Sequence, residues 1–120
     1  MNLLSKISLV LLLSTAAAAA AEDPFANYYT NTLVYTAPDK TVSKVHPEKD
    51  GTWTSTSTDP KNPANHGNWA GLGGWLCSTS SERPKSKPWC RAAKARAIGD
   101  KWTETAPDKT VYQIELVAGR

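Results

Sequence analysis

Few side chains in this sequence have the type and spacing that catalysis requires. The two histidines, His46 and His66, are the side chains that could act as bases near neutral pH. No serine stands in a Gly-x-Ser-x-Gly motif, and no His-Glu-x-x-His motif occurs. His46, Glu48 and Asp50 alternate and would offer metal ligands along one strand face, but Pro47 and a turn beginning at Asp50 argue against a regular strand there. The sequence therefore predicts a non-enzymatic protein without a metal site or cofactor.

The only two cysteines, Cys77 and Cys90, are predicted to form a disulfide. In an oxidising compartment such a pair most simply bridges, closing a loop of 12 intervening residues. No Cys-x-x-Cys motif supports a redox role. Two cysteines and two distant histidines also lack the spacing of a tetrahedral zinc site. We expect the bridge to be structural.

The first 21 residues have the form of a secretory signal peptide. A short segment carrying Lys6 precedes the apolar run Ile7–Leu13, and Ala19-x-Ala21 supplies small residues at a cleavage site. The apolar run is too short to span a hydrocarbon core of roughly 30 Å. We therefore expect residues 22–120 to be one domain, exported to the periplasm or the medium, without a transmembrane segment.

A basic cluster lies in the second half of the chain. Within fourteen residues that contain no acid stand Arg83, Lys85, Lys87, Arg91, Lys94 and Arg96. This cluster is a candidate contact for an anionic surface, a polyanionic glycan or an acidic partner protein. Alternatively, it is a solvated loop and edge strand whose charges discourage aggregation. The net charge of the whole chain, +3, is too small to indicate nucleic-acid binding.

Five tryptophans in so small a chain either fill a core or form a recognition surface. Trp53, Trp75 and Trp102 stand in strand-like sequence and are predicted to be core residues, with Trp75 beside the disulfide. The aromatic residues that flank loops are predicted to be exposed, where they could stack on sugar rings; these are Trp69, Trp89, Tyr28 and Tyr29.

The elements that must position these residues are strands. The heptapeptide Thr-Ala-Pro-Asp-Lys-Thr-Val occurs twice, at Thr36–Val42 and Thr105–Val111, and its Ala-Pro-Asp-Lys tetrad is typical of a turn. After the second copy, apolar Tyr112, Ile114 and Leu116 alternate with polar residues. Trp102–Val117 is therefore predicted to be a β-hairpin with one buried face.

The remaining segments complete an all-β prediction. Strands are expected over Tyr28–Ala37, Thr41–Val45, Thr52–Thr58 and Trp69–Ser80. The three glycines of the last strand indicate a bulge, a sharp bend or a close approach of two backbones. Asp59–Asn68 is predicted to be the longest loop, and Arg91–Ile98 fits either a strand or a short helix. The expected fold is an antiparallel meander of about seven or eight strands forming a small barrel or sandwich with one disulfide.

Several short motifs are distributed along the chain: Asn31-Thr-Leu-Val34, Asp50-Gly-Thr-Trp53, the Cys77 and Cys90 pair, Gly99-Asp-Lys-Trp102 and Leu116-Val-Ala-Gly-Arg120. Through them the mature chain resembles a group of small exported bacterial β-proteins. The resemblance implies an exported β-domain and carries over no functional residues. More distantly, size, leader, disulfide and Gly-Thr-Trp strand look like the small β-barrel inhibitors that bacteria export against secreted metalloproteases or lysozymes.

Together these features predict a non-enzymatic, monomeric binding or inhibitor-like protein. Its loop over 59–68 and its basic segment over 83–96 are the expected contacts with an unknown protein or an anionic or glycan surface. The alternative is a β-barrel that binds a small ligand or glycan through exposed tryptophan and tyrosine side chains.

Overall fold

The computed structural model describes residues 23–81 and 87–120, and contains one short 3₁₀ helix, η1, at Ala26–Tyr28, followed by strands. The predicted signal peptide, together with Arg83 and Lys85, lies outside the described residues. Within these ranges no helix is long and apolar enough to cross a bilayer. The strands are β1 Thr32–Thr36, β2 Val42–Pro47, β3 Thr52–Ser57, β4 Ala64–Leu72, β5 Trp75–Ser80, β6 Trp89–Ala92, β7 Lys101–Thr105 and β8 Val111–Val117.

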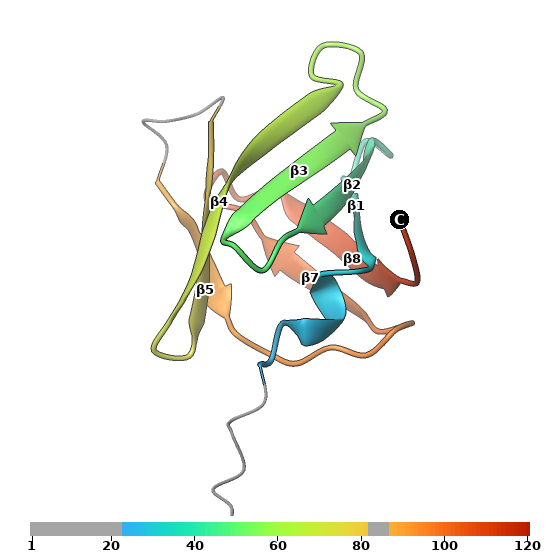
Figure 1. Cartoon of the computed structure of the whole chain (residues 1–120). Coiled ribbons are helices and arrows are strands. Elements are labelled where there is room, and N and C mark those ends of the chain that lie inside the picture. Colours follow the sequence, from blue (N-terminus) through green and yellow to red (C-terminus); the bar gives the residue numbers. More distant parts are fainter. Residues whose placement is uncertain (1–22, 82–86) are drawn as a thin grey trace, which may run out of the picture.

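The eight strands form one antiparallel sheet that curls into a nearly closed barrel (Figure 1). Their order is β6-β5-β4-β3-β2-β1-β8-β7. Strands that are consecutive in the sequence therefore pair with one another, except β6 and β7, and β1 pairs with β8. This confirms the predicted all-β antiparallel meander and selects a barrel over a sandwich. The predicted disulfide is also present, between Cys77 and Cys90.

The repeated heptapeptide forms the same turn twice, as predicted. In the first copy Lys40 N donates to Ala37 O at 3.0 Å, and in the second Lys109 N donates to Ala106 O at 2.8 Å. Both lysines adopt the left-handed conformation, with φ of 72° and 73°. This is a type I turn followed by a left-handed residue, a common hairpin connection. A third hairpin, between β2 and β3, uses the same hydrogen bonds with Gly51 at φ 89° in the lysine's place.

Four of the predicted boundaries are wrong. The strand expected over Tyr28–Ala37 begins only at Thr32, because Ala26–Tyr28 forms the 3₁₀ helix. Trp69–Ser80 is two strands, because Gly73 and Gly74 both take positive φ and form the tight β4–β5 turn rather than a bulge. The predicted loop Asp59–Asn68 ends early, since β4 begins at Ala64 and pairs with β3. Arg91–Ile98 is neither a helix nor a full strand, because only its first two residues belong to β6.

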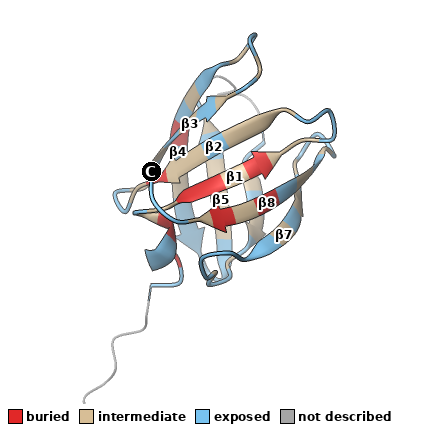
Figure 2. Cartoon of the chain, turned by 90° about the vertical axis from the view of Figure 1, so that its right-hand side faces the viewer, coloured by how far each residue is buried: buried red, intermediate tan, exposed pale blue. Residues whose placement is uncertain are grey.

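The packed core occupies one wall and one end of the barrel (Figure 2). Its buried residues come from the N-terminal segment, β1 and β8, and are Phe25, Tyr28, Leu33, Tyr35, Ile114 and Leu116. The inward positions of β2, β3, β4 and β5 include serine, asparagine and glycine, which fill far less space. Part of the barrel interior is therefore hollow.

Candidate functional site

The barrel encloses a cavity of about 680 Å³. Every strand contributes lining residues, and at one end the cavity reaches the exposed residues Pro107 and Asp108 of the β7–β8 turn. An eight-stranded barrel is just wide enough to hold one small ligand, and typical ligand pockets measure about 300–1,000 Å³. The cavity therefore has the size and position of a ligand site.

The opposite end of the barrel is closed by the N-terminal segment. Phe25 packs edge-to-face on Trp69 with ring centroids 5.4 Å apart, and Tyr28 lies 5.9 Å from Phe25. A Cβ on Gly71 would lie 3.2 Å from the Phe25 ring, so the absence of a side chain at this position lets the ring pack closely against β4. η1 thus forms the floor of the cavity, at the lower end of the barrel in Figure 1.

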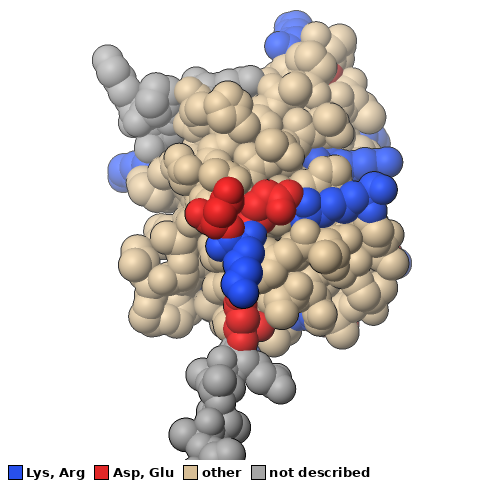
Figure 3. Space-filling view, viewed as in Figure 1, with Lys and Arg blue, Asp and Glu red and all other residues tan. Residues whose placement is uncertain are grey.

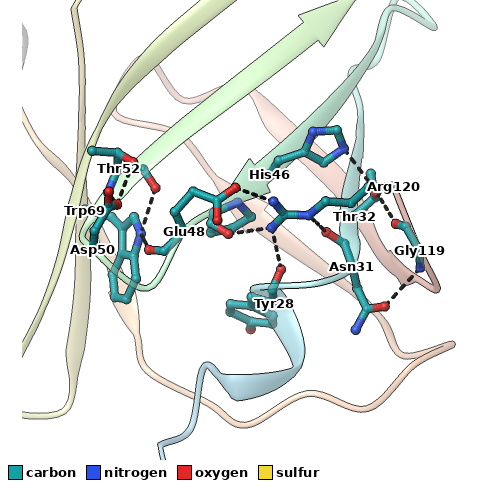
Figure 4. A network of polar contacts seen from close by, with 11 residues as sticks. Tyr28, Asn31, Thr32, His46, Glu48, Asp50, Thr52, Trp69, Gly119 and Arg120 are labelled. Carbon is teal, nitrogen blue, oxygen red and sulfur yellow. Dashed lines mark hydrogen bonds and ion pairs between the residues drawn. The ribbon is translucent and has the colours of Figure 1, made fainter.

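The C-terminal residue, Arg120, fastens this floor to the barrel (Figure 4). Its guanidinium donates to the carbonyls of Pro47 at 2.6 Å, Tyr28 at 3.2 Å and Asn31 at 3.1 Å, and it forms an ion pair with Glu48. One side chain therefore ties η1, the start of β1 and the end of β2 together.

His46 belongs to the outside of this closed end. Its Nε2 lies 3.1 Å from Thr32 Oγ1, and Thr32 donates in turn to Gly119 O at 2.6 Å. Partial burial, aided by the nearby Arg120 charge, lowers the pKa of His46. His46 does not line the cavity, and its contact with Thr32 is consistent with a structural role at this end of the barrel.

One wall of the cavity is lined with small polar side chains. The inward positions of β2, β3, β4 and β5 near the open end are Ser43, Ser55, Ser57, Asn65, Ser78 and Ser80. The strand register places Ser43 opposite Ser57 and Ser55 opposite Asn65. These residues present a continuous row of hydroxyl and amide groups to the cavity.

Part of this polar wall already has hydrogen-bond partners. Asn65 and Ser80 bond to one another at 2.8 and 3.0 Å, and Ser78 accepts from Arg91 at 2.9 Å. The Ser43 and Ser55 hydroxyls have no partner among the residues that the structure describes. Both serines are half-buried and line the cavity, so their hydroxyls are available to whatever fills it.

An aromatic wall lies beside the polar one. Tyr35 of β1, Tyr112 of β8 and Trp89 of β6 contact each other with ring centroids 5.5–6.0 Å apart. Tyr35 is opposite Ser43 in the β1–β2 register, so the two walls meet there. Burial, followed by the nearby Glu104 charge, raises the pKa of Tyr35 from 10.0 to about 12, so its hydroxyl stays protonated well into the alkaline range.

Two further indoles are held rigidly in the lining. Trp53 Nε1 donates to Asn68 O at 3.2 Å and Thr79 O at 3.1 Å, and its ring crosses β4 at Gly67. A Cβ on Gly67 would lie 2.8 Å from that ring and closer still to Thr79 O, so only glycine fits there. Trp69 Nε1 donates to backbone carbonyls of Glu48 and Thr52 at 2.9 and 3.1 Å.

An ion pair bridges the gap between β6 and β7. Arg91 Nε lies 2.9 Å from Glu104 Oε1, with side-chain exposures of 17% and 11%. Trp102 Nε1 donates to the other Glu104 oxygen at 2.7 Å, and Arg91 also donates to Trp89 O at 2.7 Å. Arg91 thus lies inside the barrel, where the β6–β7 backbones do not pair.

The predicted basic cluster is divided by the fold. Lys87 lines the open end of the main cavity and Arg91 its interior. Arg91 also lines a second, smaller pocket of about 250 Å³ beside η1, together with Lys94 and Arg96, and there the Arg96 guanidinium lies 4.1 Å from the Trp102 ring centroid. Of the described members, Lys87 is therefore apart from the three that share the smaller pocket. The face in Figure 3 shows acidic and basic side chains next to one another.

The aromatic predictions are partly reversed. Tyr28 is buried at 6% exposure, and Trp69 and Trp89 are half-buried residues of the cavity lining rather than surface groups. Trp53 and Trp102 do face inward. Trp75 shares a strand face with Cys77, as expected, but that face is the outer one, and Trp75 is 55% exposed.

Sequence reasoning missed most of the cavity lining. The serines of the polar wall, Tyr35, Tyr112 and Glu104 were not singled out as site residues. The available signal was the alternation in Thr-Trp-Thr-Ser-Thr-Ser at Thr52–Ser57, where every second residue turns inward. His66, expected in a loop, lies in β4 at an outward position opposite Thr54.

Within the described ranges, no group of three or more histidine, cysteine, aspartate or glutamate side chains could hold a metal ion. Comparisons of the chain with protein-family models, curated proteins and solved structures find no match. The properties of the site therefore follow from its own geometry.

Proposed function

We propose that this protein is an exported binding protein that holds one small organic molecule inside its barrel. The observation that carries the proposal is the cavity of about 680 Å³, closed by η1 at one end and open at the other. A core packed for stability alone fills such a space with aliphatic side chains. A hollow interior with fixed indoles and unpartnered hydroxyls is typical of a ligand site.

The proposed role is binding rather than catalysis. Neither histidine lines the cavity, and the buried acid and base, Glu104 and Arg91, are engaged with each other. The other inward side chains are hydroxyls, amides, aromatic rings and aliphatic groups such as Leu33, Val45 and Leu76, which position a ligand without activating it. The disulfide supports the proposed export, since such bridges persist in oxidising compartments.

The inhibitor-like role, in which loops grip a partner protein, stays a prediction. It draws less support than the cavity, because residues 64–68 of the expected recognition loop are strand and Arg91 is inside the barrel. The monomeric state likewise stays a prediction.

A blocked-cavity variant tests the proposed function. Ser55→Trp places an indole in the polar wall, and Thr54→Trp places the same side chain on the outer face of β3 as a matched control. A small-molecule library is screened by thermal shift against wild type, because a ligand that binds the folded state raises its melting temperature. We expect hits that Ser55→Trp loses and Thr54→Trp keeps; Ser57→Phe replaces Ser55→Trp if that variant does not fold. Hits retained in a folded blocked variant, or an absence of hits, would overturn the proposal.

A further inference from the structure

We infer that the ligand is a neutral, hydroxyl-rich ring compound, a monosaccharide or small oligosaccharide. This inference rests on the proposed function and specifies the chemistry of the same cavity. It follows from three properties of the lining: its hydroxyl and amide wall, its adjoining aromatic wall, and, among the described residues, an interior without an unpaired charge.

The polar wall sets the first requirement. Six serine and asparagine side chains line neighbouring strands, and the Ser43 and Ser55 hydroxyls have no protein partner in the described part of the chain. A hydroxyl transferred to an apolar environment without a partner costs roughly 1–3 kcal/mol in proteins. An aliphatic ligand would impose that cost at both of these hydroxyls. A ligand with several hydroxyls instead offers Ser43 and Ser55 a donor and an acceptor.

The aromatic wall sets the second requirement. Tyr35, Trp89 and Tyr112 form one cluster, and Tyr35 lies directly beside Ser43 of the polar wall. A ligand between these walls must therefore have polar edges together with an apolar face. A pyranose ring has both, since its hydroxyls project around the rim and its C–H groups present a face that packs on aromatic rings.

The charges set the third requirement. In the interior the cationic group is Arg91, already paired with Glu104, while Lys87, Asp59 and Asp108 lie on connections at the open end. A buried anionic ligand would need an unpaired cation, and a buried cationic one an unpaired acid. Among the described lining residues the interior supplies neither, so an uncharged ligand fits best.

The β3 strand supplies matched variants for the test. Ser55→Ala and Ser57→Ala remove inward hydroxyls, while Thr54→Ala and Thr56→Ala remove hydroxyls from the outer face of the same strand. Glucose, N-acetylglucosamine, cellobiose and chitobiose are titrated up to about 10 mM, with tryptophan emission and calorimetry as readouts. Decanol, a neutral compound with one hydroxyl, is the apolar comparison.

We expect at least one of these sugars to saturate the site. Ser55→Ala and Ser57→Ala should each weaken its binding about threefold to tenfold, and the outer-face variants should leave it unchanged. Sugar binding that inner and outer variants affect equally would overturn the inference. Decanol binding without sugar binding would overturn the ligand class but leave the small-ligand function standing. If neither compound binds and the library also yields no hits, both proposals fall.

Discussion

Arg91 Nε lies 2.9 Å from Glu104 Oε1, and this ion pair spans neighbouring barrel strands that no backbone ladder joins in the described structure. Both side chains are mostly withdrawn from solvent, and each has further protein partners, Ser78 for Arg91 and Trp102 for Glu104. The pair therefore replaces backbone hydrogen bonds as the connection that holds β6 against β7.

Removing one partner of this ion pair should be costly. Glu104→Leu leaves the Arg91 charge without a counterion, and we expect the free energy of unfolding to fall by about 3 kcal/mol. The double variant Arg91→Leu with Glu104→Leu should recover most of that loss, because no unpaired charge remains. Urea denaturation measures both, with the outward Thr103→Ala on β7 as control. If Glu104→Leu lowers the free energy of unfolding by less than about 1 kcal/mol, the contact between β6 and β7 does not depend on this ion pair.

Replacing either of the two lysines that adopt the left-handed conformation should stabilise the protein. Replacing Lys40 or Lys109 with glycine removes the conflict between Cβ and a positive φ, so each variant should gain about 0.5–1 kcal/mol of stability. Lys44, exposed in the middle of β2, is the matched control, and Lys44→Gly should lose stability instead. Thermal denaturation of the three variants checks this. A loss at both turn positions would contradict the shared turn geometry.

The disulfide should stabilise the weakly held end of the sheet. Cys77 and Cys90 are directly opposed on β5 and β6, and β6 pairs with no other strand in the described structure. Replacing both with serine should lower the melting temperature by about 10 °C. The comparison uses wild type with its bridge intact. A shift below about 2 °C would mean that the bridge adds little to the fold.

The raised pKa of Tyr35 predicts that the free energy of unfolding falls at high pH. Burial and the neighbouring Glu104 raise the pKa of Tyr35 from 10.0 to about 12, against the opposing influence of Arg91. The folded state therefore holds this proton more tightly than the unfolded state. The stability that protonated Tyr35 contributes to the folded state is complete below pH 10 and is lost as the pH rises towards about 12. Denaturation of wild type and Tyr35→Phe across this range should show a steeper decline for wild type; parallel curves would contradict the shift.

The sequence allowed the hairpins to be predicted because their turn chemistry is local. The Ala-Pro-Asp-Lys tetrads specify a turn through proline, aspartate and a left-handed lysine, and the turn at Asp50-Gly51 is specified by aspartate and a left-handed glycine. Gly73-Gly74 was misjudged because glycine permits both a bulge and a tight turn. The choice between them depends on β4 pairing with β5, which is a contact between strands rather than a property of the dipeptide.

The cavity was harder to predict for a physical reason. Alternation identifies a buried face only when one set of residues is apolar, and in β3 the inward residues include serines while the outward ones are threonines. A hollow interior removes the polarity contrast that a packed core would create. Trp69 and Trp89 were expected at the surface because they flank loop-like sequence, but β4 and β6 extend far enough to place both rings inside.

The central claim is that a ligand binds inside the barrel, and the indole N–H resonances of the five tryptophans test it most directly. Trp53, Trp69, Trp89 and Trp102 line the cavity, whereas Trp75 is on the outer face and serves as an internal control. Titrating ¹⁵N-labelled protein with the best-binding sugar, or with the best library hit, should shift the lining indole signals and leave Trp75 in place. A shift confined to Trp75, or no indole shift under saturating ligand, would contradict the account.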